Sequence, residues 1–401
     1  MDFYGYMRPN GKAGARNYVL LLPVNRSLNF IASNVERMTR NTRHFEIPAE
    51  TGRTEVDREV IARTLIGLMN NANVGGIVLL AVKSGAGSAY KNMCAERFEE
   101  EARKTGKPLR IVYLTNVGGS YNMLGETLRL TREVLLEVSD FRRENCPLSA
   151  LTLGVKCGTS DATSGIAGNP CVGAAFDQLI RAGGTAFFSE TTEIIGAEDL
   201  VAKRAVNESV AKKILSAARH WEDKAKATGE DIRKINPIPA NIAAGISSLE
   251  EKSLGAIAKS GTSPIQDVLK YAEMPKGSGL YFVDSWMSSL SLPLCLTACG
   301  ATIMLYQMGG GKIAQHPMMP SINPTVVSPF LYLTVNAVAY SRAPDNFDFD
   351  ASSIMTEGAS IPEMGTKLLE HLSAIASGTM TKMETLNYAE QLELYMEGPV
   401  L

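Results

Sequence analysis

Short apolar runs alternate with amphipathic stretches along the first third of the chain. The apolar runs are rich in Val, Leu and Ile, which is typical of buried parallel strands. The stretches between them repeat their apolar residues at helical spacing. This alternation predicts a doubly wound α/β domain over residues 1–145. The expected strands are 17–24, 76–82 and 109–114, and the expected helices are 57–70, 95–104 and 121–139.

A charged run that ends at Pro147 separates this region from a longer one with the same alternation. We expect residues 146–401 to form a second Rossmann-like α/β domain, larger and more elaborated than the first. Segments 285–311 and 317–341 carry no charge. Because Ser, Thr, Gly and Pro interrupt them, we expect buried interior segments and no membrane span. The expected strands are 151–155, 185–188, 280–283 and 301–306, and the expected helices are 170–182, 197–226, 249–259 and 360–378.

Composition excludes several classes of protein. The chain has 401 residues, 45% of them hydrophobic, and a net charge of −2, so it lacks the basic excess of a nucleic-acid-binding protein. The N-terminus has no apolar signal segment, and the six cysteines form no CxxC pair, so we expect reduced thiols and a cytoplasmic location. The GxGxxG, Walker A and GxSxG motifs are absent, so we expect no nucleotide cofactor.

Residues 157–170, CGTSDATSGIAGNP, form a polar, glycine-rich loop between an expected strand and an expected helix. Such a strand–loop–helix unit is how α/β enzymes build small-molecule sites. An ordinary polar connection is the alternative. The loop supplies five candidates for one pocket: Cys157, Ser160, Asp161, Ser164 and Asn169.

Five carboxylates lie at or just after expected strand ends or in glycine-rich turns: those of Asp161, Glu190, Glu193, Glu198 and Asp284. Asp161, Glu190 and Glu193 are candidate catalytic residues, because ligands bind beyond the carboxyl ends of parallel strands. Asp161, Glu190 and Asp284 together would offer hard oxygen ligands to Mg²⁺, Mn²⁺ or Fe²⁺. Alternatively, Glu193 caps or solvates the helix that follows it.

Lys252 and Lys259 lie seven residues apart, nearly on one helix face. In a pocket they would pair with substrate carboxylates, or one would act as a base if burial lowers its pKa. A solvated helix face is the alternative. Arg16 and Asn17, which precede the first strand, are candidates for carboxylate binding, although Arg16 could instead secure the N-terminal turn. Asn241 is a further substrate-binding candidate.

Three further segments complete a pattern that resembles a known family: GYMRPNGKAGARNY at the N-terminus, SETTEIIGAE after Phe188, and EKSLGAIAKSG, which contains both lysines. With the CGTSD loop, they resemble the large-subunit region of the altronate and galactarate dehydratase family, which includes the large subunit of (2R)-sulfolactate sulfo-lyase. The resemblance runs from Gly5 to about Glu384. It implies a lyase that removes the proton α to a carboxylate and eliminates a β-hydroxyl. The alternatives are another leaving group, an isomerase, or a non-catalytic paralogue.

The chain departs from this family where the family carries cysteines. Arg26, Arg53 and Ser84 stand at the expected thiol positions, and Cys157 alone remains. We therefore expect no iron–sulfur cluster. Arg26, Arg53, Lys83 and Ser84 are instead expected to bind an anion, unless the three cations point separately into solvent.

The resemblance also implies partners. Family enzymes carry a small β-rich domain ahead of the GYxRxxGxxGxRN segment, or encode it separately. We therefore expect a small anionic substrate, a homo-oligomer and a separate small subunit as a further partner.

Overall fold

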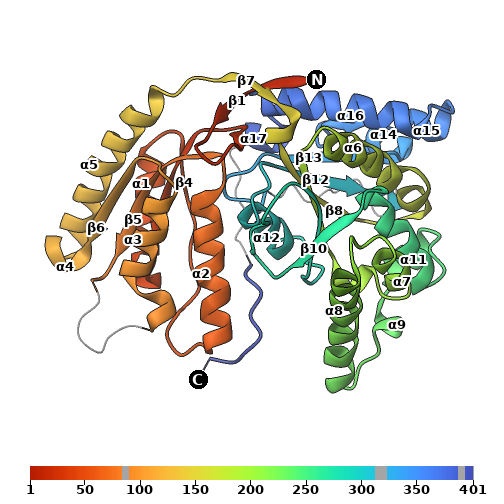
Figure 1. The fold of residues 1–401 in the computed structure, drawn as a ribbon, viewed down its shortest axis with the longest axis horizontal. Helices are drawn as coiled ribbons and strands as arrows, with labels where there is room; N and C mark the ends of the chain where they lie inside the picture. Colours follow the sequence, from red (N-terminus) through yellow and green to blue (C-terminus); the bar gives the residue numbers. More distant parts are fainter. Residues whose placement is uncertain (84–89, 312–322, 387–392, 401) are drawn as a thin grey trace.

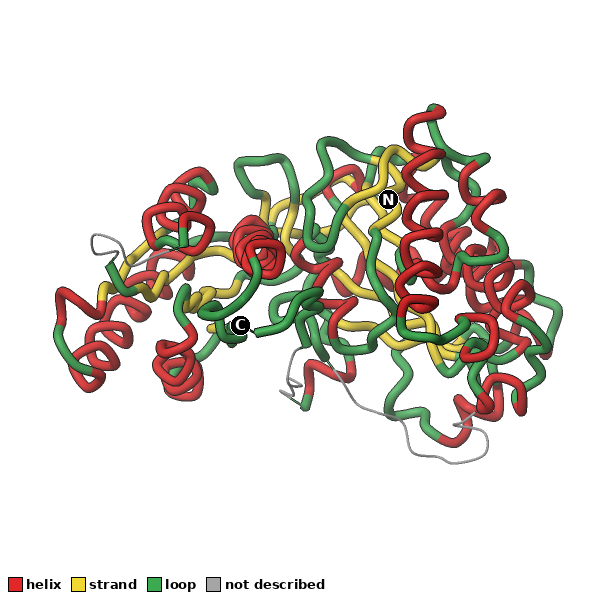
Figure 2. The backbone as a smooth tube through the Cα atoms, turned by 90° about the horizontal axis from the view of Figure 1, so that it is seen from below, coloured by secondary structure: helices red, strands yellow, loops and turns green. Residues whose placement is uncertain are grey.

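The computed structural model describes residues 1–83, 90–311, 323–386 and 393–400. Figure 1 shows two α/β units side by side, the N-terminal unit in red to yellow and the C-terminal unit in green to blue. Each unit is built on its own parallel sheet. Figure 2 shows these strands between layers of helices.

The first unit has a four-stranded sheet in the order β4-β3-β5-β6, and all its pairs are parallel. Alternate residues of β3 enter different cores: Val19 and Leu21 pack with α1 and α5, whereas Leu20 and Leu22 pack with α2 and α3. Helices therefore cover both faces of this sheet. The strands are β3 (Tyr18–Pro23), β4 (Thr42–His44), β5 (Val74–Ala81) and β6 (Leu109–Tyr113), and the helices are α1 (Asn29–Met38), α2 (Glu55–Asn70), α3 (Ala95–Lys104), α4 (Leu114–Val117) and α5 (Ser120–Ser139).

The second unit has a seven-stranded parallel sheet in the order β10-β11-β9-β8-β12-β13-β14. The chain starts in the middle at β8, and β9 and β12 lie on opposite sides of it. The carboxyl ends of β8 and β12 thus flank a topological switch point, where open α/β sheets bind ligands. The strands are β8 (Thr152–Gly158), β9 (Thr185–Phe188), β10 (Ile265–Leu269), β11 (Gly279–Val283), β12 (Ile303–Met308), β13 (Phe330–Thr334) and β14 (Phe349–Asp350).

Helices α6 and α16 cover one face of the larger sheet, and α12 packs on the other. Gly67 of α2 permits a close approach to α12, because a Cβ there would lie 2.2 Å from the Ala298 carbonyl oxygen. The two units therefore share a continuous core. The helices are α6 (Asn169–Arg181), α7 (Glu198–Ala202), α8 (Glu208–Ala227), α9 (Ile232–Ile235), α10 (Pro239–Ala243), α11 (Leu249–Ile257), α12 (Ser291–Ala298), α14 (Ala337–Arg342), α15 (Ser353–Thr356), α16 (Ile361–Ala376) and α17 (Lys382–Thr385).

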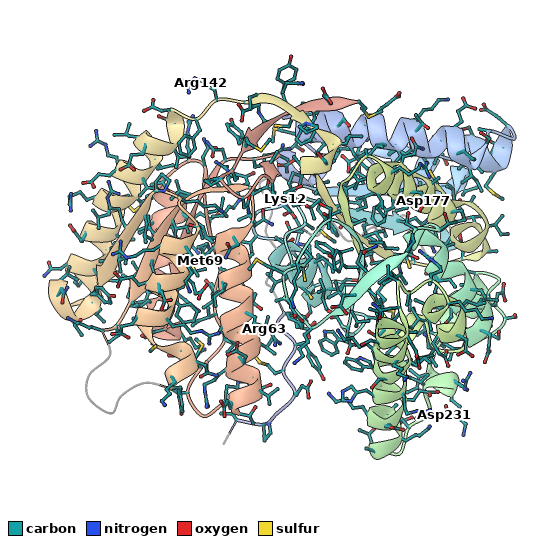
Figure 3. The ribbon with its side chains drawn as sticks, viewed as in Figure 1. Lys12, Arg63, Met69, Arg142, Asp177 and Asp231 are labelled. Atoms are coloured by element: carbon teal, nitrogen blue, oxygen red, sulfur yellow. The ribbon has the colours of Figure 1, made fainter. Side chains whose placement is uncertain are left out.

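A small antiparallel sheet joins the two units. Its central strand β1 (Asp2–Met7) pairs with β2 (Ala13–Gly14) and with β7 (Glu144–Pro147), so the expected boundary at 145/146 falls inside β7. Lys12, labelled near the centre of Figure 3, follows β1 and donates a hydrogen bond to Thr185 at the start of β9 (3.1 Å). These contacts hold the N-terminal hairpin against the second unit.

The expected α/β class with parallel sheets is confirmed. The single helix expected over 197–226 is instead two helices, because Asn207 caps a new helix by accepting a hydrogen bond from the Val210 amide. Within the described part of the uncharged segments, α12, β12 and β13 are buried. None of the described helices is long and apolar enough to cross a membrane.

Candidate active site

The centre of the site is formed where β8 and β9 end. Lys156 and Cys157 close β8, and Glu190 and Glu193 lie in the turn directly after β9. Because β8 and β9 are parallel neighbours, these four side chains meet at one edge of the sheet. Glu190 is fully buried and has a left-handed backbone (φ 73°), a strained conformation that is enriched at functional sites.

Two further lysines come from α11 and the short turn after it. Lys252 lies within α11, and Lys259 lies in the 3₁₀ turn 258–260. Close packing brings this segment to the CGTSD loop: Gly165 and Gly255 approach so closely that a Cβ on either would lie about 3 Å from the other's Cα. Asp177 of α6, labelled in Figure 3, secures the end of the segment by accepting the Thr262 and Ser263 amides (2.9 Å).

The six side chains form one buried network. Each carboxylate has an outer oxygen, Oε1, that pairs with a lysine, and an inner oxygen, Oε2, that lies next to Cys157. Glu190 Oε1 lies 3.3 Å from Lys156 Nζ, and Glu193 Oε1 lies 3.1 Å from Lys252 Nζ. The Oε2 atoms face Cys157, whose sulfur lies 3.5 Å from that of Glu190 and 3.4 Å from that of Glu193, so its one proton can be donated to either. Lys259 Nζ forms an ion pair with Glu190 Oε2 and lies 3.1 Å from the Cys157 sulfur.

Electrostatics hold this network in a defined charge state. Burial alone raises the pKa of Glu190, but the Lys259 and Lys156 ammoniums outweigh it and lower the pKa to about 2. Burial alone lowers the pKa of Lys259, yet Cys157 and the two glutamates raise it above its usual range. Burial, reinforced by both carboxylates, raises the pKa of the Cys157 thiol.

The described cluster therefore carries one ammonium more than it has carboxylates. An excess charge at a buried site is stabilised when an opposite charge binds beside it. The excess ammonium favours a small anion beside Lys252, the lysine of the cluster that lines the cavity; the carboxylates of Asp161 and Glu251 line the same cavity.

The depressed pKa of Glu190 predicts a loss of stability in acid. A carboxyl whose pKa falls from 4.5 to about 2 on folding stabilises the protein above pH 4.5, by roughly 3 kcal/mol. This contribution disappears as the pH falls from 4.5 through about 2. Urea unfolding followed across this window should show a steep decline for the wild type and a shallower one for Glu190→Gln. Parallel declines for the two proteins would contradict the assignment.

A cavity of about 260 Å³ opens beside the cluster. All five candidates from the CGTSD loop line it, together with Lys252 of α11. Asn169 Oδ1 is buried at this cavity and has no hydrogen-bond partner among the described residues. The side-chain amide of Gln307, which lies opposite Cys157 on β12 and is not part of the cavity lining, is also buried without a partner among the described residues. Unsatisfied buried polar atoms of this kind call for a bound water or ligand.

Asp161 connects the loops around the cavity. Its Oδ2 accepts hydrogen bonds from the Gly310 amide (2.7 Å) and Asn336 Nδ2 (3.1 Å), and its Oδ1 accepts from the Ser164 amide (3.1 Å). Asn241 contributes in a similar way, donating to the Ser160 carbonyl (3.0 Å) and accepting from Lys252 (3.2 Å). Both residues hold the cavity wall in place.

Other candidates lie away from the cavity. Arg16 forms an ion pair with Glu384 (2.6 Å) and donates to backbone carbonyls, while Asn17 bonds Arg8 and the Val138 carbonyl. Their hydrogen-bonding groups serve the contact between distant segments, so the structure places them in a structural role. Asp284 accepts from Trp221 and Thr191 and lines a separate, larger cleft of about 1290 Å³.

The basic residues of the first unit are not brought together by any described contact. Arg26 and Lys83 are exposed, and Arg53 donates to the Ala49 carbonyl (3.3 Å). Ser84 lies outside the described residues. The anion site that these residues would form stays a prediction.

The residues that could hold a metal differ from those expected. Cys157, Glu190 and Glu193 are a buried group in which one ligand atom of each lies within 4.8 Å of the others. The expected set of Asp161, Glu190 and Asp284 stays a prediction; Asp161 accepts a hydrogen bond from the Gly310 amide, and Asp284 lines the other cleft. The chemistry of the donor set suits a divalent ion, but Lys259 Nζ already contacts all three side chains.

Three residues of the site were not expected from the sequence. Lys156 is a charged residue inside an otherwise apolar strand, a signal that could have identified it. Asn236, which accepts from Lys252 (2.7 Å), and Gln307 have no such local signal. Their roles depend on strand order and loop packing.

Comparison with known proteins identifies the family of the chain. The family model described as D-galactarate/Altronate dehydratase, C-terminal, matches residues 148–399, and the model described as D-galactarate dehydratase/Altronate hydrolase, second domain, matches residues 5–139. The chain therefore belongs to the galactarate and altronate dehydratase family, and the expected family and its lyase class are confirmed.

Curated relatives match almost the whole chain. The (2R)-sulfolactate sulfo-lyase subunit beta of Chromohalobacter salexigens is 32% identical, covering 97% of this chain and 96% of that protein. The altronate dehydratase of Bacillus subtilis is 29% identical, covering 100% of this chain and 78% of that protein. The galactarate dehydratase (L-threo-forming) of Escherichia coli is 29% identical, covering 99% and 77%.

Proposed function

We propose that this protein is a lyase that dehydrates a small hydroxy-carboxylic acid by α-proton removal and β-elimination. The observation that carries the proposal is the buried cluster of three lysines, two glutamates and one cysteine beside the 260 Å³ cavity. Its excess positive charge suits a carboxylate substrate. The relatives named as dehydratases of sugar acids support the reaction type.

Cavity size supports a small substrate. Pockets for drug-sized ligands begin at about 300 Å³, and this cavity is slightly smaller. It suits a short hydroxy acid better than a nucleotide. Hydroxyl groups of such an acid would find hydrogen-bond partners in Ser160, Ser164 and the unpaired Asn169 Oδ1.

Different side chains of the site bind the substrate, stabilise developing charge and transfer protons. Lys252, which lines the cavity and is held by Glu193, binds the substrate carboxylate. The Lys259 and Lys156 ammoniums supply positive potential as negative charge develops on that carboxylate during proton removal. The carboxylate of Asp161, which lines the cavity, accepts the α-proton, and the thiol of Cys157, which also lines it, donates the proton with which the β-hydroxyl leaves as water. Glu190 is held ionised by two lysines and keeps those lysines in place.

No step of the proposed reaction uses a resident Mg²⁺, Mn²⁺ or Fe²⁺ ion. Such an ion would polarise the substrate carboxylate as a Lewis acid, with Cys157, Glu190 and Glu193 as the group that could hold it. Because Lys259 Nζ lies against those same donors, the residues as arranged do not fit an additional cation.

The proposal is tested by turnover. Purified protein is incubated with a panel of four- to six-carbon hydroxy acids, roughly the size that the cavity suggests, and products are detected by mass spectrometry. We expect one or more acids to lose water. Sulfolactate belongs in the panel, because release of sulfite would favour the sulfo-lyase reaction named for one relative. No product from any acid, with the folded chain alone or with a small subunit, would refute the proposal.

We also propose that the chain works in a complex. One relative is named as a beta subunit, which supports a partner subunit here. A homo-oligomer of the chain and a separate small β-rich subunit remain our expectation. Light scattering of the purified chain and co-purification from the native host test the two parts separately.

A further inference from the structure

The ammonium group of Lys259 contacts all three side chains that could hold a metal. Lys259 Nζ contacts the inner oxygen Oε2 of Glu190, lies 3.1 Å from the Cys157 sulfur and lies 3.8 Å from Glu193 Oε2. These side chains are the same three whose ligand atoms gather within 4.8 Å of one another. The outer oxygens of both carboxylates are engaged by Lys156 and Lys252. Lys259 therefore lies where an ion bound by the inner donors would lie.

An ion and a charged Lys259 cannot share this space. Metal–sulfur and metal–oxygen bonds are about 2.3 Å and 2.0–2.2 Å long for zinc, so an ion bound to these donors would lie against the ammonium. Two cations in direct contact inside a protein repel strongly. Binding a metal would therefore require Lys259 to leave.

The fold opposes such a movement. Lys259 is 1% exposed, and its turn is held on one side by Asp177 through the Thr262 and Ser263 amides. On the other side, a Cβ at Gly173 would lie 2.3 Å from the Ala258 carbonyl, so α6 leaves no room for the turn to retreat.

We infer that the Lys259 ammonium is the resident cation of the Cys157, Glu190 and Glu193 group and excludes a divalent metal from it. Lysine charge then does at this site what a bound metal would do, by stabilising negative charge at the inner edge of the cavity. The inference concerns the same site as the proposed function, but it is tested through metal binding and does not depend on any turnover.

The test is a titration with Co²⁺, whose thiolate complexes absorb in the near ultraviolet. Chelator-treated wild type should show no thiolate–cobalt band. Lys259→Met should bind Co²⁺ with that band and at least about 100-fold more tightly, because the metal no longer competes with a buried ammonium. The double variant Lys259→Met/Cys157→Ser should lose the band.

Matched controls separate the inference from a general disturbance. Lys252→Met removes a lysine that pairs with the outer oxygen of Glu193, so it should not create the cobalt band. Lys259→Arg keeps a cation in place and should stay without the band as well. Circular dichroism checks the fold of each variant.

Two results would overturn the inference: a stoichiometric thiolate–cobalt band in the wild type, or no band in folded Lys259→Met. A thiolate–cobalt band in the wild type would overturn the inference even if Lys259→Met does not fold. Failure of the lyase assay together with these expected spectra would reject the proposed function and leave the inference standing.

Discussion

Replacing Glu190 by alanine is expected to lower the free energy of unfolding by about 3–5 kcal/mol, the range measured when one partner of a buried ion pair is removed. Glu190 is fully buried and is the carboxylate that pairs with both Lys156 and Lys259. Without it, two buried ammoniums lose their nearest counter-charge. Urea unfolding at neutral pH measures the change.

Asp199→Ala is the matched control for this prediction. Asp199 lies on α7, which follows the turn that contains Glu190, and its side chain is exposed. It should change the free energy of unfolding by less than about 0.5 kcal/mol. A Glu190→Ala variant as stable as the Asp199→Ala control would mean that the ion pairs contribute little, and the electrostatic account of the site would fail.

Removal of the Lys252 ammonium is expected to produce the largest loss of activity. Lys252 is the lysine that lines the cavity, and Glu193, Asn236 and Asn241 hold its ammonium in place. Loss of a buried charge–charge contact with a ligand costs about 2–5 kcal/mol. Lys252→Met should therefore lower kcat/KM about 30- to 4000-fold, since each 1.4 kcal/mol is tenfold.

Lys213→Met serves as the control for Lys252→Met, because Lys213 lies on α8 in an exposed pair with Asp267. It should leave kcat/KM within about twofold of the wild type, as expected of a surface ion pair. Lys252→Arg, which keeps the charge, should recover part of the lost activity through a lower KM. Equal losses in Lys213→Met and Lys252→Met would show that the cavity is not where substrate binds.

The sequence pattern was sufficient to predict the α/β class and most strands of both sheets. Buried parallel strands are uniformly apolar, and this signal is local. The edge strands β10 and β14 and the helix α12 were not predicted. These elements carry mixed or uniformly apolar residues, so periodicity alone could not distinguish them from loops or strands.

Part of the site could be predicted because its residues are close together in the sequence. The CGTSD loop residues are contiguous, so their common cavity follows from one strand–loop–helix unit. Lys252 and Lys259 were named, but their contact with Glu193 and Glu190 depends on β9 lying beside β8. Strand order is a long-range property that the sequence pattern does not carry.

Arg16 has a partner that lies far away in the sequence. An arginine ahead of the first strand is a reasonable carboxylate ligand, and it does bind a carboxylate, but that of Glu384 in α17 (2.6 Å). The two residues are separated by most of the chain, so no local pattern reveals the pair. Asp284 likewise accepts a hydrogen bond from Trp221 of α8 and lines the larger cleft, a location that depends on how α8 packs.

The central claim is that the cavity beside the buried cluster binds a hydroxy acid and that its lining side chains remove the α-proton. The most direct measurement uses an acid that the protein converts, labelled with deuterium on the carbon next to its carboxylate. The account predicts that the wild type releases the deuterium into water as product forms, and that Lys252→Met releases it at least about 30-fold more slowly. Product that retains all its deuterium, or a Lys252→Met variant that releases it at the wild-type rate, would contradict the account.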